Sequence, residues 1–427
     1  MTIKFLRCSA SAWFSLLALL APVLAQAAPA DAQVLRGAYL AKAGDCAACH
    51  STAKGQPYAG GLPMVTPMGK IYSTNITPDR ETGIGRWSLA DFDAAMRRGV
   101  SKDGHHLYPA MPYPSYAKVR TEDIGALYAY FMKGVPAVRQ ANRPSDIPFP
   151  LNMRWPLALW NLVFLDTSTY QDKSGQSVVW NRGAYLVQGL GHCGACHTPR
   201  GVAFQEHALD ERSDAWLNGT VVDGWFASNL TGDGSAGLGR WSVADLAQFL
   251  KTGANDHATA FGGMTDVINN STHMLGDDDL NAIATYLKSL PAKGGAGGPA
   301  YAYDPKASVA LLARPGNDAG AQVYVTNCMQ CHGAAGKAAA PLLAPLAGNP
   351  NVLAQEPMSL INVTLNGTRD VVLHGVPAAY PMPSFAAVLS DRQVADVLTF
   401  IRAGWNNGAP AVTAQQVAKV RKATATR

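Results

Sequence analysis

The sequence carries little charge. Only 15% of its 427 residues are Asp, Glu, Lys or Arg, whereas soluble domains typically have ~25%. The formal net charge of +5 is small and spread along the chain. No basic arm or stripe of the kind that binds nucleic acid is therefore visible, and we expect no such partner. One basic cluster lies at the C-terminus, where we interpret residues 409–427 as a solvated tail bearing Lys419, Arg421, Lys422 and Arg427.

Long apolar runs are also scarce, with one exception at the N-terminus. Lys4 and Arg7 precede an apolar run from Ala12 to Leu24, and the following Ala25–Ala27 offers an A-x-A cleavage site. The run is shorter than the ~20 residues that a membrane-spanning helix needs. We predict that residues 1–27 form a secretory signal peptide and that the chain is exported. An uncleaved membrane anchor is the alternative.

Cysteines are few, and six of the seven belong to one repeated pattern. Cys8 lies inside the predicted signal peptide and would leave with it. The other six form three Cys-x-x-Cys-His motifs, which are Cys46-Ala-Ala-Cys49-His50, Cys193-Gly-Ala-Cys196-His197 and Cys328-Met-Gln-Cys331-His332. No cysteine remains for a disulfide that would cross-link the mature fold.

This motif is typical of covalent c-type haem attachment. Two thiols at this spacing add to the two vinyl groups of one haem, and the adjacent histidine binds the iron. Three disulfides would leave the histidines unexplained, a thioredoxin-like pair needs a βαβ context, and zinc sites would require an even number of motifs. We therefore predict three covalent haems c with His50, His197 and His332 as axial ligands.

Each iron needs a second axial ligand, which in cytochromes c is usually Met. Met111 in YPAMPYPSY and Met382 in YPMPSF follow the first and third motifs. The flanking prolines suit a ligand loop because they lower the entropy that is lost when the loop orders. His105 and His106 are the competing ligands in the first module.

The second module offers two methionines. Met264 lies in the Gly-rich stretch FGGMTDV, at a spacing from His197 similar to that between His50 and Met111. Met274 abuts the start of the following helix, where packing against that helix explains it. We favour Met264 as the ligand.

The haem motifs sit within internal repeats. RGAYL occurs at residues 36–40 and again at 182–186, and GIGRWSLADF at 83–92 recurs as GLGRWSVADL at 237–246. A third module keeps only the outline of haem motif, Met loop and closing helix. Repeated units of this kind predict tandem domains.

Each module is predicted to be small and helical. Apolar residues at helical spacing predict closing helices at about 121–133, 277–290 and 390–404, with Thr121, Asp277 and Ser390 as N-caps. Middle helices should begin at Ser88 and Ser242, each followed three residues later by Asp. First helices should run into the haem motifs through Tyr39, Tyr185 and Tyr324.

Two linkers separate the modules. Residues 292–303 are Gly-rich, and residues 141–175 contain the apolar run FPLNMRWPLALWNLVFLD. The apolar run is interpreted either as a helix buried between modules or as a patch that docks a partner or the membrane surface. The predicted organisation is signal peptide 1–27, haem domain 28–140, apolar linker 141–175, haem domain 176–291, Gly-rich linker 292–303, haem domain 304–408 and basic tail 409–427.

The repeat also places pairs of polar and aromatic residues at matching sites. Trp87 matches Trp241, and Asn75 matches Asn229. Core packing and turn formation explain both pairs. The alternative is contact with the haem edge, in which the Trp N–H or the arginine before each Trp (Arg86 or Arg240) holds a propionate.

The haem motifs, the duplicated SNIT/SNLT…GRWS segments, YPAMPYPSY and RWPLALWN resemble the triheme cytochrome c subunits of bacterial membrane-associated dehydrogenases. These subunits serve quinoprotein alcohol dehydrogenases and flavin-dependent gluconate, 2-ketogluconate or sorbitol dehydrogenases. The resemblance covers nearly the whole mature chain. It implies an all-α fold of three class I cytochrome c domains. It also implies His ligands at His50, His197 and His332, and Met ligands at Met111, Met264 and Met382.

The resemblance further implies a PQQ- or FAD-dependent catalytic subunit as partner, with a small third subunit as an additional expectation. The complex would associate peripherally with the periplasmic side of the inner membrane and pass electrons to ubiquinone. His/Met ligation leaves no open iron site, which favours electron transfer over catalysis. The alternatives are a stand-alone periplasmic carrier, an oxidase-linked cytochrome, or a haem enzyme such as a peroxidase or thiosulfate dehydrogenase with a displaceable Met at the second haem.

Overall fold

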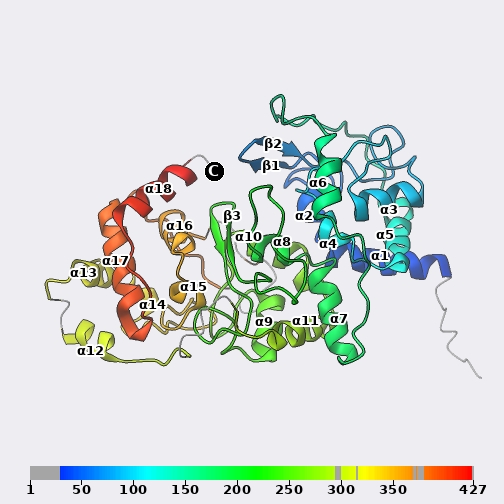
Figure 1. The fold of residues 1–427 in the computed structure, drawn as a ribbon. Coiled ribbons are helices and arrows are strands. Elements are labelled where there is room, and N and C mark those ends of the chain that lie inside the picture. Colours follow the sequence, from blue (N-terminus) through cyan, green and yellow to red (C-terminus); the bar gives the residue numbers. More distant parts are fainter. Residues whose placement is uncertain (1–28, 294–299, 314–315, 369–371, 373–378, 426–427) are drawn as a thin grey trace, which may run out of the picture.

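The computed structural model describes residues 29–293, 300–313, 316–368, 372 and 379–425 (Figure 1). The predicted signal peptide and much of the Gly-rich linker lie outside these residues. The described part is helical, with two short antiparallel hairpins. The all-α prediction is confirmed, and the hairpins are small additions to it.

The three modules follow one another along the chain. The first contains α1 (Pro29–Ala43), α2 (Cys46–His50), β1 (Pro63–Thr66), β2 (Gly69–Tyr72), α3 (Leu89–Arg98), α4 (Tyr113–Tyr116) and α5 (Thr121–Lys133), and α6 (Pro156–Phe164) follows it. The second contains α7 (Val178–Gln188), α8 (Gly194–His197), β3 (Thr220–Val222), β4 (Trp225–Ala227), α9 (Val243–Thr252), α10 (Gly263–Asn270), the 3-10 helix η1 (Thr272–Met274) and α11 (Asp277–Ser289). The third contains α12 (Lys306–Ala313), α13 (Ala319–Asn327), α14 (Met329–His332), α15 (Pro350–Leu353), α16 (Met358–Asn366), α17 (Asp391–Ala403), the 3-10 helix η2 (Gly404–Asn406) and α18 (Ala414–Thr424).

The middle helices begin where the sequence predicts. Ser88 caps α3 and Ser242 caps α9, each in a reciprocal capping box with the Asp three residues later. Ser390 caps α17 in the same way, with Gln393 as its partner. These local signals confirm three of the predicted helix starts.

Two predicted N-caps are wrong. Thr121 and Asp277 are the first residues inside α5 and α11, and the cap positions belong to Arg120 and Gly276. Neither of those residues supplies a side-chain cap. The chain satisfies these two helix ends through another module.

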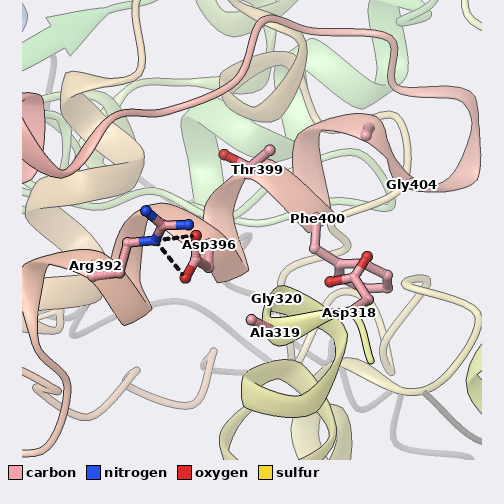
Figure 2. A pocket seen from close by; sticks show the side chains of 9 residues that line it. Asp318, Ala319, Gly320, Arg392, Asp396, Thr399, Phe400 and Gly404 are labelled. Carbon is pink, nitrogen blue, oxygen red and sulfur yellow. Dashed lines mark hydrogen bonds and ion pairs between the residues drawn. The ribbon is translucent and has the colours of Figure 1, made fainter. Parts of the chain in front are cut away.

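The first and closing helices of each module cross at a glycine. A Cβ on Gly37 of α1 would lie 1.9 Å from the Ala126 carbonyl oxygen of α5, and one on Gly183 of α7 would lie equally close to that of Ala282 on α11. In the third module a Cβ on Gly320 would lie 2.3 Å from the Asp396 carbonyl oxygen (Figure 2). Only glycine lets the two backbones approach this closely.

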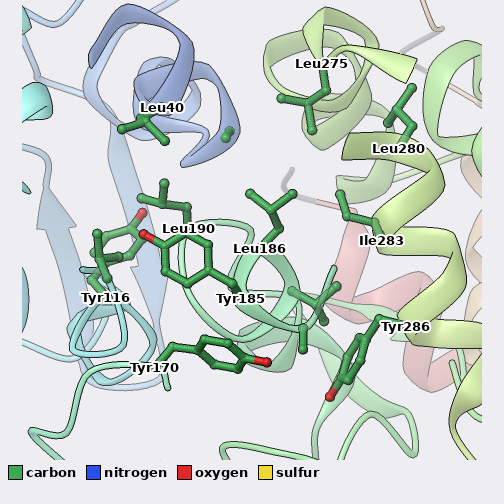
Figure 3. Packing of buried hydrophobic residues seen from close by; sticks show 14 of the residues in the cluster. Leu40, Tyr116, Tyr170, Tyr185, Leu186, Leu190, Leu275, Leu280, Ile283 and Tyr286 are labelled. Atoms are coloured by element: carbon green, nitrogen blue, oxygen red, sulfur yellow. The ribbon is translucent and has the colours of Figure 1, made fainter. Parts of the chain in front are cut away.

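The first two modules share one hydrophobic core, and the third has its own. The shared cluster runs from Leu40 to Leu290, and the other from Leu311 to Val420. Figure 3 shows Leu40 of α1 facing two leucines of the second module, Leu186 and Leu190. Among the described residues, the first two modules therefore pack as one body.

The linker helix α6 is not buried between modules. None of its residues is buried, and Leu159, Leu162 and Val163 are 59%, 81% and 62% exposed. Trp160 is its anchor, because its Nε1 donates to the Ala203 carbonyl at 2.9 Å. The structure thus rules out the buried alternative for the outer face of this helix.

Residues 409–425 are ordered, contrary to the prediction of a solvated tail, and Arg427 lies outside the described residues. This segment forms α18, whose Val417 and Val420 are buried in the third core. Arg421 donates to Asp391 Oδ1 at 2.7 Å and to two backbone carbonyls. Valines spaced three apart on a capped helix explain the packing, which the basic residues obscured in the sequence.

Within the described residues, no helix combines the length and apolarity needed to cross a bilayer.

Candidate haem sites

Each cysteine pair lies on a single helical turn. Cys46 and Cys49 belong to α2, and the other pairs flank or lie in α8 and α14. In each pair the first thiol is half-buried, the second is exposed, and both are free. Residues three apart share a helix face, so both thiols of a pair point to the same side. One planar group on that side could therefore reach both thiols of a pair.

Within the described ranges, no group of three or more His, Cys, Asp or Glu residues is arranged to hold a metal ion.

The three motif histidines are held in the same way. Each Nδ1 lies within hydrogen-bond distance of a backbone carbonyl oxygen: His50 to Thr74 at 2.7 Å, His197 to Ser228 at 2.7 Å and His332 to Ala344 at 2.9 Å. A carbonyl oxygen only accepts, so Nδ1 carries the hydrogen and Nε2 keeps its lone pair. This arrangement orients a histidine for metal ligation.

The protonation of these histidines suits the same role. Burial lowers the pKa of His50, His197 and His332, although the carbonyl hydrogen bond opposes the shift. The neutral imidazole, which is the form that binds metals, therefore predominates. Paired free thiols next to a neutral imidazole with a free Nε2 fit a covalent c-type haem.

Met111 and Met382 lie on the predicted loops. Met111 is half-buried just before α4 and packs against the shared core, and its N–H donates to the Tyr108 carbonyl at 3.1 Å. The Met382 N–H donates to Thr368 Oγ1 at 2.7 Å, and its carbonyl accepts from the Thr368 N–H at 3.0 Å. Hydrogen bonds thus fix the backbone of both methionines, from which the side chains with the ligand sulfurs extend.

The second module differs from the prediction of a loop ligand. Met264 is half-buried in the first turn of α10, which packs against the first haem motif helix α2. Met274 is half-buried at the end of η1. Both methionines therefore lie on elements that contact the first module, α10 against α2 and η1 against α1.

The competing histidines of the first module have other partners. His105 is exposed and its Nδ1 lies 2.5 Å from Asp103 Oδ1. His106 Nδ1 lies 3.4 Å from Asn161 Nδ2 of α6. These contacts explain both residues without a haem.

A cytochrome c family model matches residues 34–134 and 318–405. The gluconate 2-dehydrogenase cytochrome c subunit of Pantoea cypripedii is 54% identical over 419 residues, which cover 96% of this chain and 95% of that protein.

The chain belongs to the family of dehydrogenase cytochrome c subunits.

Two further relatives carry the name of another dehydrogenase. The cytochrome c subunit of the quinone alcohol dehydrogenase of Komagataeibacter europaeus is 49% identical over 419 residues, covering 96% of this cytochrome and 88% of the relative. Its counterpart in Gluconobacter oxydans is 47% identical over 396 residues, covering 92% and 82%. This cytochrome is thus an electron-transfer subunit that holds covalent haem c, and not itself a catalytic subunit.

Trp241 and the preceding Arg240, both repeated from the first module, have different surroundings. Trp241 is buried and its Nε1 has no hydrogen-bond partner in the described chain, which suits an acceptor such as a haem propionate. Arg240 instead binds the carbonyls of Gly234 and Gly348 and stacks on Tyr301. Arg240 thereby joins the second and third modules, and its contact with a haem propionate stays a prediction.

Asn75 follows the simpler interpretation. Its Oδ1 accepts from the Thr77 N–H at 2.9 Å, and its Nδ2 donates to the Val138 carbonyl at 2.8 Å. Asn229 Oδ1 accepts from the Thr231 N–H at 2.7 Å. Turn formation thus explains this repeated pair.

Sequence reasoning missed the carbonyls that orient the histidines. Thr74 and Ser228 directly precede the repeated Asn75 and Asn229, so the repeat itself contained their signal. In the third module, no such repeated residue follows Ala344, so the sequence did not indicate its role.

Proposed function

We propose that this cytochrome carries three haems c and relays electrons from a dehydrogenase catalytic subunit to ubiquinone, on the periplasmic side of the inner membrane. The common Nδ1-to-carbonyl bond at His50, His197 and His332 carries the proposal. It gives all three motifs the same ligand geometry. The haem supplies the one-electron chemistry, and the chain supplies ligation, orientation and environment.

Met111, Met264 and Met382 are the proposed second ligands. A histidine and a methionine at each iron would leave no open site for substrate, and the haem would supply one-electron transfer. A Met264→Ala variant tests the ligand of the second module, with Met274→Ala as its matched control. Loss of the low-spin spectrum and a lowered potential at one haem are expected for Met264→Ala alone. The reverse pattern would assign Met274.

Contacts between modules support a relay. Tyr116 Oη donates to the Gly44 carbonyl at 3.0 Å, and its ring lies 5.8 Å from that of His192. Gly44 and His192 stand just before the first and second haem motifs. Ser228, whose carbonyl holds His197, also donates from Oγ to Asn351 of the third module at 3.1 Å.

A catalytic partner is proposed from the relatives, which are named as subunits of gluconate and alcohol dehydrogenases. It would use PQQ or FAD, and a small third subunit is part of the same proposal. The exposed face of α6, with Trp155 just before it at 69% exposure, is the proposed contact with that partner or with the membrane surface.

The test uses a tagged copy of this cytochrome in gently solubilised membranes. Ethanol, gluconate, 2-ketogluconate and sorbitol are added in turn while the reduced c-haem band is recorded. Co-purification of a larger subunit and reduction by one substrate are expected, followed by reoxidation with a ubiquinone analogue. A chain that emerges alone and stays oxidised with every substrate would favour a stand-alone carrier.

A Leu162→Glu variant on α6 sharpens that test. Loss of substrate-driven reduction would place the partner on this face. Loss of membrane association with reduction retained would place the lipid surface there.

A further inference from the structure

The arginines that begin the two RGAYL repeats bind the closing helix of their own module. Arg36 Nε donates to Asp123 Oδ1 on α5 at 2.7 Å. Arg182 donates from Nε and Nη2 to the two carboxylate oxygens of Asp279 on α11, both at 2.7 Å. These pairs lie beside the glycine crossings and hold each first helix to its closing helix.

The tyrosines three residues later reach the opposite module. Tyr39 Oη donates to Asp279 Oδ2 at 2.6 Å, and Tyr185 Oη donates to Asp123 Oδ2 at 2.6 Å. Each aspartate therefore binds an arginine of its own module and a tyrosine of the other. Short hydroxyl-to-carboxylate bonds of this kind are among the stronger hydrogen bonds in proteins.

The same hydroxyls also complete the closing helices. The Arg120 N–H donates to Tyr185 Oη and the Gly276 N–H donates to Tyr39 Oη, both at 3.3 Å. In a capping box the N-cap N–H bonds directly to the side chain at N3. Here a tyrosine of the other module stands between the two groups and so replaces this half of a capping box in α5 and α11.

The reciprocal bonds of Tyr39 and Tyr185 to the other module, called the tyrosine exchange here, lie next to the haem motifs. The chain leads from Tyr39 through Leu40 to Gly44, and from Tyr185 to Leu190, before each first cysteine. A Cβ on Gly44 would lie 3.3 Å from Leu190 Cδ2, and Tyr116 donates to the Gly44 carbonyl while its ring packs against that of His192. The two attachment segments are therefore in direct contact just beyond the tyrosines.

The third module lacks the exchange. Counted from its glycine crossing at Gly320 and Asp396, the positions of the arginine, tyrosine and aspartate hold Ala319, Gln322 and Gln393. Gln393 instead completes the local capping box of α17. The exchange thus belongs to the pairing of the first two modules and is not a requirement of the fold.

We propose that Tyr39 and Tyr185 are positioning residues that fix the first and second haem-attachment segments against each other and so set the rate of electron transfer between those two haems. The proposal rests on the proposed presence of both haems. It does not depend on which dehydrogenase supplies the electrons.

The test uses the isolated, haem-loaded full chain with both tyrosines changed, Tyr39→Phe and Tyr185→Phe. Tyr324→Phe is the matched control, because Tyr324 Oη also donates a short hydrogen bond, to the Gly333 carbonyl at 2.7 Å, but within one module. A ruthenium photoreductant injects one electron, and its equilibration among the haems is followed optically. Haem content and amide exchange at Arg120 and Gly276 are measured on the same samples.

The double variant should keep its haems, exchange the two cap amides faster and equilibrate several-fold more slowly than wild type, whereas Tyr324→Phe should equilibrate normally. Normal equilibration in the double variant with full haem content would overturn the proposal. If the double variant does not accumulate, Tyr39→Phe alone decides in the same way, since Tyr39 is the less buried tyrosine. A wild-type chain with fewer than three haems would instead refute the proposed function and is recognised from the haem content.

Discussion

The contact between the first and second modules differs in kind from the contact between the second and third. The first two share one hydrophobic core, and each donates a tyrosine to an aspartate of the other. The third joins the second through separate hydrogen bonds, such as those of Ser359 Oγ with the Phe226 backbone, Asn362 Nδ2 with the Gly224 carbonyl and Ser228 Oγ with Asn351 Oδ1. Its core is separate.

The difference shows how a repeated sequence can acquire a fixed pairing. A motif that binds its own module through Arg and a neighbour through Tyr produces a reciprocal interface as soon as two copies face each other. The third copy, which has Gln at the tyrosine and aspartate positions, keeps the glycine crossing and loses the pairing. Four predictions test this contrast, and the largest comes first.

Gly183→Ala should destabilise the paired modules by about 3 kcal/mol or more, because the new Cβ would lie 1.9 Å from a backbone carbonyl oxygen that cannot move aside. Urea unfolding followed by tyrosine and tryptophan fluorescence measures the change. Gly125→Ala on α5 is the control. No atom lies within 4 Å of its added Cβ, so it should be neutral or stabilise by up to about 1 kcal/mol. Equal effects of the two changes would contradict the close approach of α7 and α11 at Gly183.

Asp123→Ala should cost about 2 to 3 kcal/mol, because it leaves the buried Tyr185 hydroxyl without its acceptor and releases Arg36. Gln393→Ala at the equivalent position of the third module should cost only about 1 kcal/mol, the value of an exposed cap. Chemical unfolding of both variants gives the comparison. A cost at Gln393 as large as that at Asp123 would mean that the exchange adds nothing to an ordinary helix cap.

Val417→Ala on α18 should destabilise the third core by about 2 kcal/mol, since Val417 is fully buried there. The first two modules should be unaffected because their core is separate. Hydrogen exchange resolved by segment measures both parts in one sample. Faster exchange spreading into α7 or α11 would show that the cores are coupled.

Acid should weaken the paired modules through Asp279. Burial opposes ionisation of this carboxyl, but the hydrogen bonds from Arg182 and Tyr39 lower its pKa. A lowered folded-state pKa gives stability that is fully present above the unfolded pKa of about 3.9 and is lost as pH falls through the folded value. Urea unfolding between pH 7 and pH 3 should show this loss, and Asp279→Asn should reduce it. An unchanged profile in Asp279→Asn would remove Asp279 from the explanation.

The sequence predicted the local features of the fold well. Ser88, Ser242 and Ser390 mark their helices because a capping box depends only on residues within one turn. The starts at Thr121 and Asp277 were misplaced because the groups that complete those helix ends come from another module, far away in sequence. The buried face of α18 was missed because its basic residues dominate the composition of the tail.

The haem sites show the same difference between local motifs, which were predicted, and contacts between modules, which were not. The cysteine and histidine positions follow from contiguous motifs, which is why they could be predicted directly. The methionine of the second module could not be settled, because Met264 and Met274 both lie where two modules meet. The reciprocal roles of Tyr39 and Tyr185 required knowing which modules face each other.

The most direct measurement is the intact mass of the mature chain, followed by peptide mapping of its cysteines. Three haems per chain are predicted, each joined by thioethers to one of the pairs Cys46 and Cys49, Cys193 and Cys196, and Cys328 and Cys331. Fewer than three haems, or a disulfide within any pair, would contradict the three-haem relay.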